Sequence, residues 1–242
     1  MLMAILRAMI VLAYTVFMSF MSGAALLLRN PDDHYRAVGY WWSRYLLKFC
    51  GVTVTVSGRE RIPDPSGIIY VANHASMLDI CVCYAYLPGQ VRFVGKRELT
   101  FVPFFGWFWK LSGNIPIDRR SPKRFQRSLD FAYRTIERGK CIILFPEGTR
   151  TRSGQMQDFK RGPFSLAARS KATVVPVTIN GSYSILRPGS VRIRPGSISV
   201  VIHEPVLPSD AWNGKDKERE MMTSVQEQIA SAYIPQGVAD AG

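Results

Sequence analysis

The sequence lacks the cysteine patterns that hold small domains together. Its four cysteines lie in apolar stretches and do not have the paired spacing of a disulfide or zinc framework: Cys50, Cys81, Cys83 and Cys141. Cys81 and Cys83 are two residues apart, which in a helix directs them to different sides and argues against a shared metal ion. We therefore predict no metal site, and we expect three of the four to be core residues in a reducing compartment.

Acidic residues are also scarce. The chain has 18 Asp and Glu against 31 Lys and Arg, which gives a net charge of +13. Such a surface attracts anions, and charge alone does not choose between nucleic acid, lipid head groups and a phosphorylated substrate. The basic run Arg120, Lys123, Arg124 and Arg127 shows no pattern for reading bases. We therefore expect it to face a membrane or a coenzyme, and we expect no nucleic-acid partner.

Internal repeats and low-complexity tracts are absent, and 242 residues are enough for one sizeable core. From Val52 onward, short β-branched runs alternate with helical patterns, which predicts an α/β sandwich around a largely buried sheet. The expected helices cover about residues 76–87, 122–138, 161–170 and 215–233. The expected strands are "VTVTV", "GIIYVAN", "VRFVG", "NIPID", "CIILF", "VVPVTI" and "SISVVIH".

Charged residues are missing from positions 8–28, "AMIVLAYTVFMSFMSGAALLL". This run is long enough for a membrane helix, whereas the apolar region of a signal peptide is only about 7–15 residues long. The following "HYRAVGYWWSRYLLKFC" mixes aromatic and basic residues with leucines, as an interfacial helix does, although a docking helix fits as well. We predict a membrane anchor and interfacial helix over residues 1–48 and one domain over 49–242. Hydropathy does not tell whether the anchor spans the membrane.

One apolar run, "GIIYVANHASMLD", ends in His74 and Asp79, five residues apart. On an ideal helix this spacing separates side chains by about 140°, so the two meet only if His74 stays in the loop and Asp79 lies in the first helical turns. Asp79 then favours the imidazolium and the helix N-terminus opposes it, a balance that suits a general base. A structural histidine is the alternative. Ser76 is not expected to be a nucleophile, because no "GxSxG" elbow surrounds it.

A second run, "CIIL", continues into "FPEGTR", residues 145–150. Pro146 and Gly148 allow a sharp turn with exposed N–H groups, and Arg150 has the planar fork that matches phosphate. Glu147 would repel phosphate, so we infer that it orients Arg150 or binds an acceptor hydroxyl. The alternative is a charged turn held by an internal ion pair.

Together these segments resemble the glycerolipid acyltransferases of the lysophosphatidate acyltransferase type. "NHASMLD" is similar to the first motif of that family, "GNIPIDR" to the second, "FPEGTR" to the third and "VVPVTI" to the fourth, in the right order over about residues 52–205. "VGKRELTFVPFFGW" and "FKRGPFSLAARS" resemble intervening segments of the family. Ala75 and Pro116 depart from the more usual residues, which weakens any inference about the acceptor.

The resemblance implies an α/β fold with a mixed, mostly parallel sheet flanked by helices, and an O-acyltransferase that needs no cofactor. His74, held by Asp79, would deprotonate the free hydroxyl of a lysophospholipid, 1-acyl-sn-glycerol 3-phosphate. The hydroxyl oxygen would then attack the thioester of acyl-CoA or acyl carrier protein without a covalent intermediate. The implied substrate-binding residues are Lys96, Arg119, Glu147, Gly148, Thr149 and Arg150.

Two alternatives stay open. The acceptor could be another lyso-lipid, such as a lyso-ornithine lipid, or the chain could be a non-catalytic lipid-binding protein. Because the donor is cytosolic, the enzyme interpretation places the domain on the cytoplasmic side of an anionic membrane, the inner membrane of a bacterium. The segment "FVPFFGWFWKL", with six aromatic residues in eleven, is predicted to be an acyl-chain channel or a membrane-dipping surface, with a buried core segment as the alternative.

Overall fold

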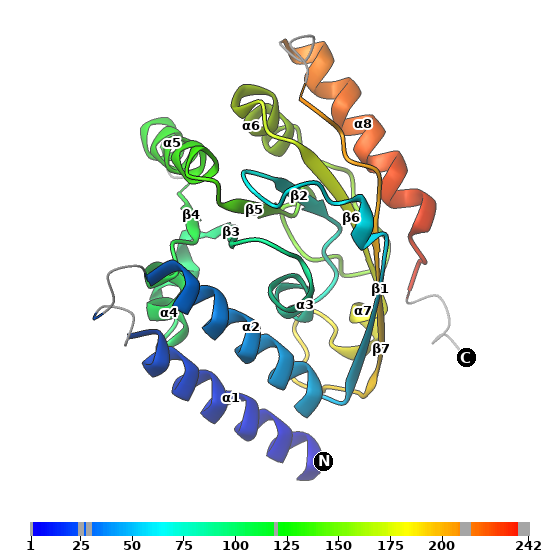
Figure 1. Ribbon diagram of the computed structural model, residues 1–242. Coiled ribbons are helices and arrows are strands. Elements are labelled where there is room, and N and C mark those ends of the chain that lie inside the picture. The colour runs from blue at the N-terminus through cyan, green and yellow to red at the C-terminus, as the bar shows by residue number, and fades with distance from the viewer. Residues whose placement is uncertain (1, 24–26, 28–30, 119–120, 209–213, 237–242) are drawn as a thin grey trace.

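The computed structural model describes residues 2–23, 27, 31–118, 121–208 and 214–236. Within these residues the chain forms a seven-stranded sheet of order β1-β7-β6-β2-β5-β3-β4 (Figure 1). The strands are β1 (Val52–Ser57), β2 (Ile69–Ala72), β3 (Val91–Lys96), β4 (Ile115–Ile117), β5 (Cys141–Leu144), β6 (Val174–Asn180) and β7 (Gly196–Ile202).

The sheet is mixed but mostly parallel, as predicted. Strands β6, β2, β5, β3 and β4 run parallel to one another, whereas β7 pairs antiparallel with β6, and β1 is parallel to β7. The carboxyl ends of five neighbouring strands therefore lie at one edge of the sheet. In open α/β sheets this is the edge where ligands bind.

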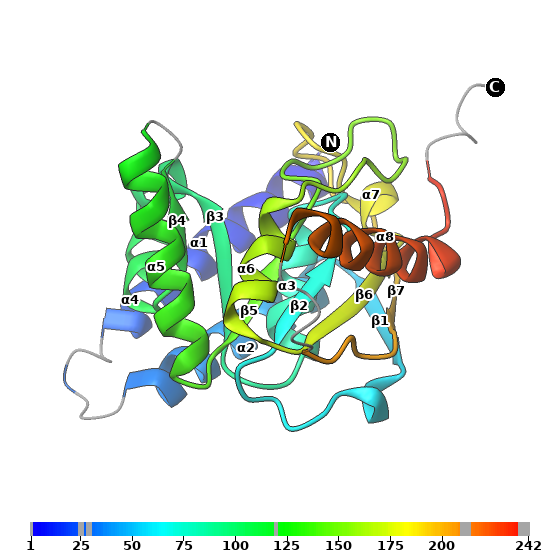
Figure 2. The same cartoon turned by 90° about the horizontal axis from the view of Figure 1, so that it is seen from above.

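Helices cover both faces of the sheet, as Figures 1 and 2 show. One face carries α1 (Leu2–Gly23), α2 (Pro31–Phe49), α3 (Leu78–Tyr86) and α4 (Phe105–Leu111). The other face carries α5 (Pro122–Glu137), α6 (Gly162–Ser170) and α8 (Lys215–Ala232). Three short helical turns lie in the connections: η2 (Arg59–Arg61), η3 (Arg97–Phe101) and α7 (Ser182–Ile185).

The local sequence explains why most elements were predictable. Strands β2, β5 and β6 are buried at every position, so each reads as a continuous apolar run, whereas β1 at the sheet edge alternates. Helix α5 begins after Ser121, whose side chain accepts a hydrogen bond from the Arg124 amide at 3.3 Å, and Pro122 occupies the first turn. All seven expected strands and the four expected helices are confirmed, while α4 was not predicted.

Helix α1 forms an outer layer on α2 and α4. Met18 packs in a small cluster with Val38 and Phe108, and the Tyr14 hydroxyl donates to the Trp41 carbonyl at 2.9 Å. Among the described helices, none combines the length and the apolar character needed to cross a membrane. The anchor predicted for residues 1–48 is therefore unsupported as a spanning helix, and the division at residue 49 stays a prediction.

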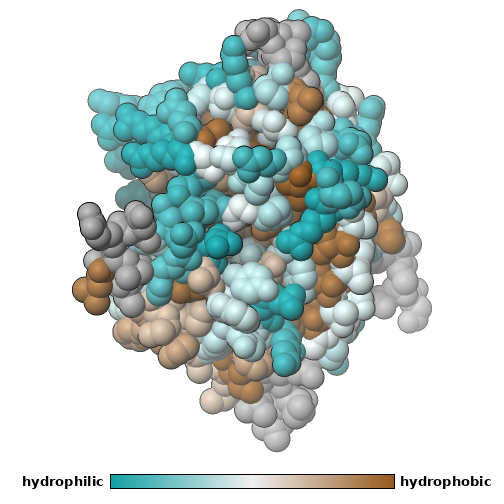
Figure 3. All heavy atoms as spheres, viewed as in Figure 1, coloured by the Kyte–Doolittle hydropathy of each residue, from teal (hydrophilic) through white to brown (hydrophobic). Residues whose placement is uncertain are grey.

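Part of this layer presents apolar side chains on the outside. In Figure 3, brown and tan atoms gather at the lower left, over α1 and α4, whereas teal atoms cover α5 at the upper left. Phe20 of α1 and Trp107 of α4 are 56% and 51% exposed, and their rings lie 6.0 Å apart next to Phe104. We call Phe20, Phe104 and Trp107 the aromatic cluster.

Candidate active site

The polar residues singled out in the sequence follow neighbouring strands. His74 follows β2, the segment 145–150 follows β5, Lys96 ends β3, and Asp118 follows β4. These four strands are consecutive in the sheet and parallel. Since adjacent strands lie about 4.8 Å apart, β3 is roughly 10 Å from β2, a span that one phospholipid head group and its ester bonds can cover. The fold therefore brings these residues to one edge.

His74 and Asp79 meet as the spacing predicts. His74 lies in the loop after β2, Asp79 lies in the first turn of α3, and the imidazole Nδ1 is 2.8 Å from Asp79 Oδ2. The His74 side chain is 13% exposed and Asp79 is fully buried. Because an ionised carboxylate only accepts hydrogen bonds, Nδ1 carries the hydrogen and Nε2 keeps its lone pair. Nε2 has no hydrogen-bond partner within the described part of the chain.

Asp79 also organises the loop that carries His74. Its Oδ2 accepts hydrogen bonds from the backbone amides of Ala75 and Ser76, both at 2.8 Å. Its Oδ1 is buried and has no partner among the described residues. The Ser76 hydroxyl donates to the Leu186 carbonyl at 2.8 Å, which is a structural role.

Glu147 joins the two loops, which the sequence did not predict. Its Oε1 accepts the backbone amide of His74 at 2.7 Å, and its Oε2 accepts the backbone amide of Gln157 at 3.0 Å. The side chain is 2% exposed, and this burial raises the pKa of Glu147 to about 7, although the two amides oppose the shift. Each hydrogen bond described for this carboxyl group goes to His74 or Gln157, so we find no support for its predicted contact with Arg150.

Phe145, the first residue of the same motif, stacks on the His74 ring. Its ring is 4.0 Å from the imidazole of His74 with an interplanar angle of 13°. Thr151, just after the motif, donates its backbone N–H to the His74 carbonyl at 3.0 Å. The third motif therefore holds the ring and the backbone of His74 at the same time.

The basic residues near this pair are accessible. Arg150 is half-buried and Lys96 is exposed, and neither has an ion-pair partner in the described part of the chain. Lys160 was missed in the sequence, although it lies in the quoted "FKRG" segment. Its amide donates to the Pro146 carbonyl at 2.9 Å, and its Nζ lies 2.8 Å from where a Cβ on Gly148 would be. Lys160 is therefore a further candidate for binding an anion beside the third motif.

Gly148 has a left-handed backbone with φ of +75°, which a glycine adopts without strain. Its own N–H donates to the Phe145 carbonyl at 3.0 Å and closes the turn. Any backbone donor to an oxyanion would therefore come from a neighbouring residue, such as the exposed Thr149.

Arg119 lies outside the described residues, as does Arg120, and their roles stay predictions. The adjacent Asp118 forms ion pairs with Arg97 at 3.2 Å and with Arg124 at 3.4 Å. A cavity of about 340 Å³ opens here, between α4 and α5 at the edge of the sheet. Its lining residues are Arg97, Thr100, Phe101, Lys110, Pro116, Asp118 and Ser128.

The aromatic segment is neither fully buried nor fully exposed. Phe108 and Trp109 are core residues of α4, whereas Phe101 and Trp107 are exposed. One side of the segment therefore packs as a core helix does, and the other side is free to meet an apolar partner.

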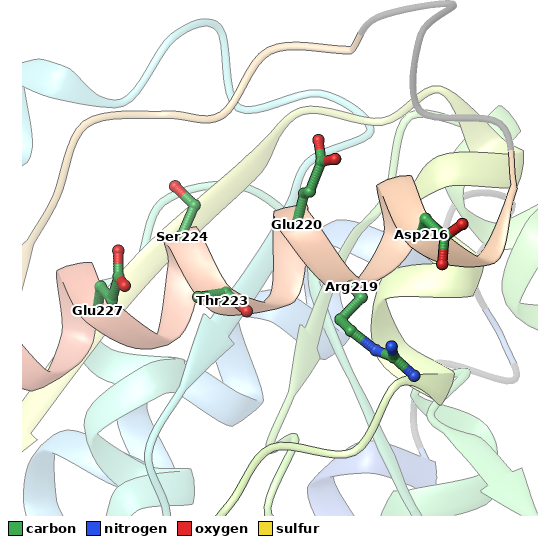
Figure 4. Close-up of a pocket in the computed structure, with 6 residues that line it drawn as sticks. All are labelled: Asp216, Arg219, Glu220, Thr223, Ser224 and Glu227. Carbon is green, nitrogen blue, oxygen red and sulfur yellow. The ribbon is translucent and has the colours of Figure 1, made fainter.

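A surface hollow also lies along α8 (Figure 4). Its six lining residues, Asp216, Arg219, Glu220, Thr223, Ser224 and Glu227, all come from the solvent side of this one helix. Because no other element contributes polar groups, the hollow lacks the convergent donors of a binding site. We assign it no function.

A comparison with protein families identifies the family of this chain. Residues 53–180 match the family model described as Acyltransferase, and the chain belongs to this family. It is an acyltransferase.

Named relatives extend this result. The chain is 30% identical to the 1-acyl-sn-glycerol-3-phosphate acyltransferase of Chlamydomonas reinhardtii, over 99% of this chain and 73% of the relative. It is 31% identical to chloroplastic LPAT1 of Arabidopsis thaliana, over 74% of this chain and 50% of the relative. For the Saccharomyces cerevisiae 1-acyl-sn-glycerol-3-phosphate acyltransferase, the identity is 30%, over 79% of this chain and 63% of the relative. The chain thus spans only half to three quarters of these relatives.

The fold is similar to a solved structure. The crystal structure of the 1-acyl-sn-glycerophosphate (LPA) acyltransferase PlsC from Thermotoga maritima matches with a TM-score of 0.80 and 26% identity, and the match covers 97% of each chain. The match extends over α1 and α2 as well as the sheet.

Proposed function

We propose that this acyltransferase moves a fatty acyl group from acyl-CoA or acyl carrier protein to the free hydroxyl of 1-acyl-sn-glycerol 3-phosphate, giving phosphatidate. One observation carries the proposal: His74 is held through Nδ1 by Asp79, and Nε2 has no partner among the described residues, at the sheet edge that also carries Lys96 and Arg150. The names of the relatives support the choice of acceptor.

The reaction follows from the free nitrogen. Nε2 of His74 takes the proton of the acceptor hydroxyl as the oxygen attacks the thioester carbonyl. The carbon–sulfur bond then breaks, the imidazolium returns the proton to the departing thiolate, and an ester and a free thiol remain. Asp79 stabilises the imidazolium that forms between the two transfers. No acyl group is attached to the protein at any step.

The acceptor phosphate needs cations close to this base. Arg150 offers a planar guanidinium in the segment that is bonded to the His74 backbone, and Lys160 Nζ lies next to Gly148 of that segment. Lys96, the last residue of β3, and Arg119, which follows Asp118 in the sequence, complete the proposed phosphate site. In the proposal Glu147 touches no substrate and keeps the two loops in register.

We further infer that the protein works at a membrane surface. The aromatic cluster places exposed rings of α1 and α4 side by side, an arrangement that suits contact with lipid. A cytosolic donor then places the catalytic edge on the cytoplasmic side, and a bacterial inner membrane remains part of the proposal.

The test is release of free thiol from a long-chain acyl-CoA by detergent-purified protein. Lysophosphatidate, glycerol 3-phosphate and lyso-ornithine lipid are offered in parallel, and the series is repeated with acyl carrier protein as donor. We expect release that depends on lysophosphatidate and falls by about 10²–10⁴-fold in His74→Ala. His34→Ala is the matched control, because His34 lies at the start of α2 and binds the Met21 carbonyl.

The outcomes separate the alternatives. Release driven by another acceptor would keep the mechanism and overturn the acceptor. Full activity in a folded His74→Ala protein would overturn the mechanism. No release with any donor and acceptor would favour a lipid-binding protein without turnover.

A further inference from the structure

The segment that follows α8, residues 233–236, lies against the loop that follows the third motif, residues 151–157. The carbonyl of Gly154 accepts two hydrogen bonds from this segment, from the Gln236 amide at 2.9 Å and the Tyr233 hydroxyl at 2.8 Å. On the other side of the loop, the Tyr183 hydroxyl donates to the Arg152 carbonyl at 2.7 Å. The loop is thus held at two of its carbonyls by parts of the chain that are distant in sequence.

Gly154 shows how close this contact is. Its φ is +75°, and a Cβ placed on it would lie 1.8 Å from the Gln236 carbonyl oxygen. Such a contact is impossible for any other residue unless the loop and the C-terminal segment move apart. The close approach of the loop to the C-terminal segment therefore requires glycine at position 154 for two reasons: the positive φ and the absence of a side chain.

The C-terminal segment is itself fixed to the sheet. Asn180, the last residue of β6, accepts the Ile234 amide and donates to the Ala232 carbonyl, both at 2.9 Å. Gln236 uses its side-chain oxygen to accept from the amide and the hydroxyl of Ser184, at 3.3 and 3.2 Å. The buried side of α8, opposite the side drawn in Figure 4, packs into the core through Met221, Val225 and Ile229.

The loop in turn reaches the catalytic pair. At its start, Thr151 donates its amide to the His74 carbonyl at 3.0 Å. At its end, Gln157 donates its amide to Glu147, whose other oxygen holds the His74 amide. A shift of this loop would therefore move Arg150, the residue just before it, relative to the base.

We propose that residues 233–236 are a positioning element that sets the acceptor-binding geometry of the loop after the third motif, with Tyr233 and Gln236 as positioning residues. This role rests on the proposed function, because it concerns the place where the acceptor phosphate is held. The element touches no substrate. Its effect should therefore appear in acceptor binding rather than in donor binding.

The test compares two glycine variants in the full-length chain. Gly154→Ala introduces the clash with Gln236. Gly189→Ala is the matched control, because Gly189 has φ of +82° and a Cβ there would meet no atom within 4 Å. Both substitutions strain the backbone similarly, and only one separates the loop from the C-terminal segment. Gln236→Pro is a second variant: it removes the amide donor to Gly154, together with the side-chain acceptor for Ser184, and leaves the sequence of the loop unchanged.

We expect Gly154→Ala and Gln236→Pro to raise the apparent KM for lysophosphatidate by about 10- to 30-fold, as the loss of one or two hydrogen bonds would, with the donor KM unchanged. Trypsin should cleave both variants after Arg152 sooner than it cleaves wild type. This measurement does not depend on enzyme activity. Gly189→Ala should behave as wild type in both measurements.

The contrary results are distinct. Equal KM values for Gly154→Ala and Gly189→Ala, or lower thermal stability with no change in acceptor KM, would overturn the positioning role. Equal trypsin cleavage of the two variants would overturn the contact itself. A wild-type protein that releases no thiol with any acceptor would overturn the proposed function, and the cleavage comparison would still report separately on the contact.

Discussion

The backbone amide of His74 donates a 2.7 Å hydrogen bond to the carboxylate of Glu147, 73 residues away in the sequence. The Thr151 amide returns a hydrogen bond to the His74 carbonyl at 3.0 Å. The loop with His74 and the loop with Arg150 are thus paired through side chain and backbone. This pairing fixes how the two loops lie against each other, so a shift of one loop should also shift the other.

Glu147 should make stability depend on pH. Its pKa is raised from 4.5 to about 7, mainly by burial, so the folded protein holds a proton that the unfolded chain releases between these values. The folded state therefore loses stability as pH rises through this window, by at most about 3 kcal/mol, and the loss is complete above the folded pKa. Glu147→Gln cannot titrate, and urea unfolding at pH 5 and pH 7.5 should show a smaller decrease for this variant than for wild type.

Glu204→Gln is the control for that comparison, since Glu204 is exposed and pairs with Arg61. If the Glu147→Gln and wild-type stabilities ran parallel between the two pH values, Glu147 would already be ionised in the folded protein at pH 5.

Asp79→Asn should reduce turnover by about 10²–10⁴-fold. One oxygen of Asp79, Oδ2, serves Nδ1 and both the Ala75 and Ser76 amides. An asparagine oxygen in that place keeps these three contacts but loses the negative charge that stabilises the imidazolium. An asparagine NH₂ in that place donates to Nδ1, so the imidazole hydrogen moves to Nε2 and the base is lost. Thiol release with saturating donor measures the effect, with Asp130→Asn on the exposed side of α5 as the control. Near-normal turnover in a folded variant would show that Asp79 is not needed for the charge of the base.

Arg150→Ala should raise the KM for lysophosphatidate by about 10- to 150-fold, the worth of one charge-assisted hydrogen bond. Lys160→Ala should act in the same direction and more weakly, because a lysine makes a point contact rather than a forked one. The donor KM should stay constant in both. Arg192→Ala, an exposed arginine in the loop before β7, is the matched control. A rise in the donor KM alone would assign these cations to the coenzyme instead.

Trp107→Arg should weaken binding to vesicles that contain anionic lipid by roughly tenfold, because the ring loses its apolar contact. The new charge is attracted to such vesicles, so a decrease can only come from the lost apolar surface. Leu207→Arg changes another exposed apolar residue, 65% exposed, outside the aromatic cluster. Co-sedimentation gives the comparison, and equal binding of the two variants would place the membrane contact elsewhere.

The fold was predictable where a short stretch of sequence determines the local structure. Buried strands such as β5 are continuous apolar runs. The start of α5 is marked in the sequence by the N-cap Ser121 and by Pro122. Helix α4 was missed because its aromatic residues have no clear helical period, and tertiary contacts with α1 and η3 support it. The membrane anchor was inferred from hydropathy, which left open whether it spans and does not report that α1 packs on α2 and α4.

The site was predictable only within each motif. His74 and Asp79 are five residues apart, so whether their side chains meet depends only on the local geometry of one loop and one helical turn. The hydrogen bond between Glu147 and His74 could not be predicted from local sequence, because it joins two segments that only the sheet brings together. Lys160 could have been found from the quoted "FKRG" segment, but its place beside Gly148 depends on how the chain returns after residues 151–157.

The stacking of Phe145 on His74 has a consequence for how protons travel. Phe145 covers one face of the imidazole and Nδ1 is bonded to Asp79, so a turn of the ring would cost both contacts. In the proposed reaction the nitrogen that receives the proton therefore also delivers it. Alcohol and thioester would then both have to come within reach of Nε2.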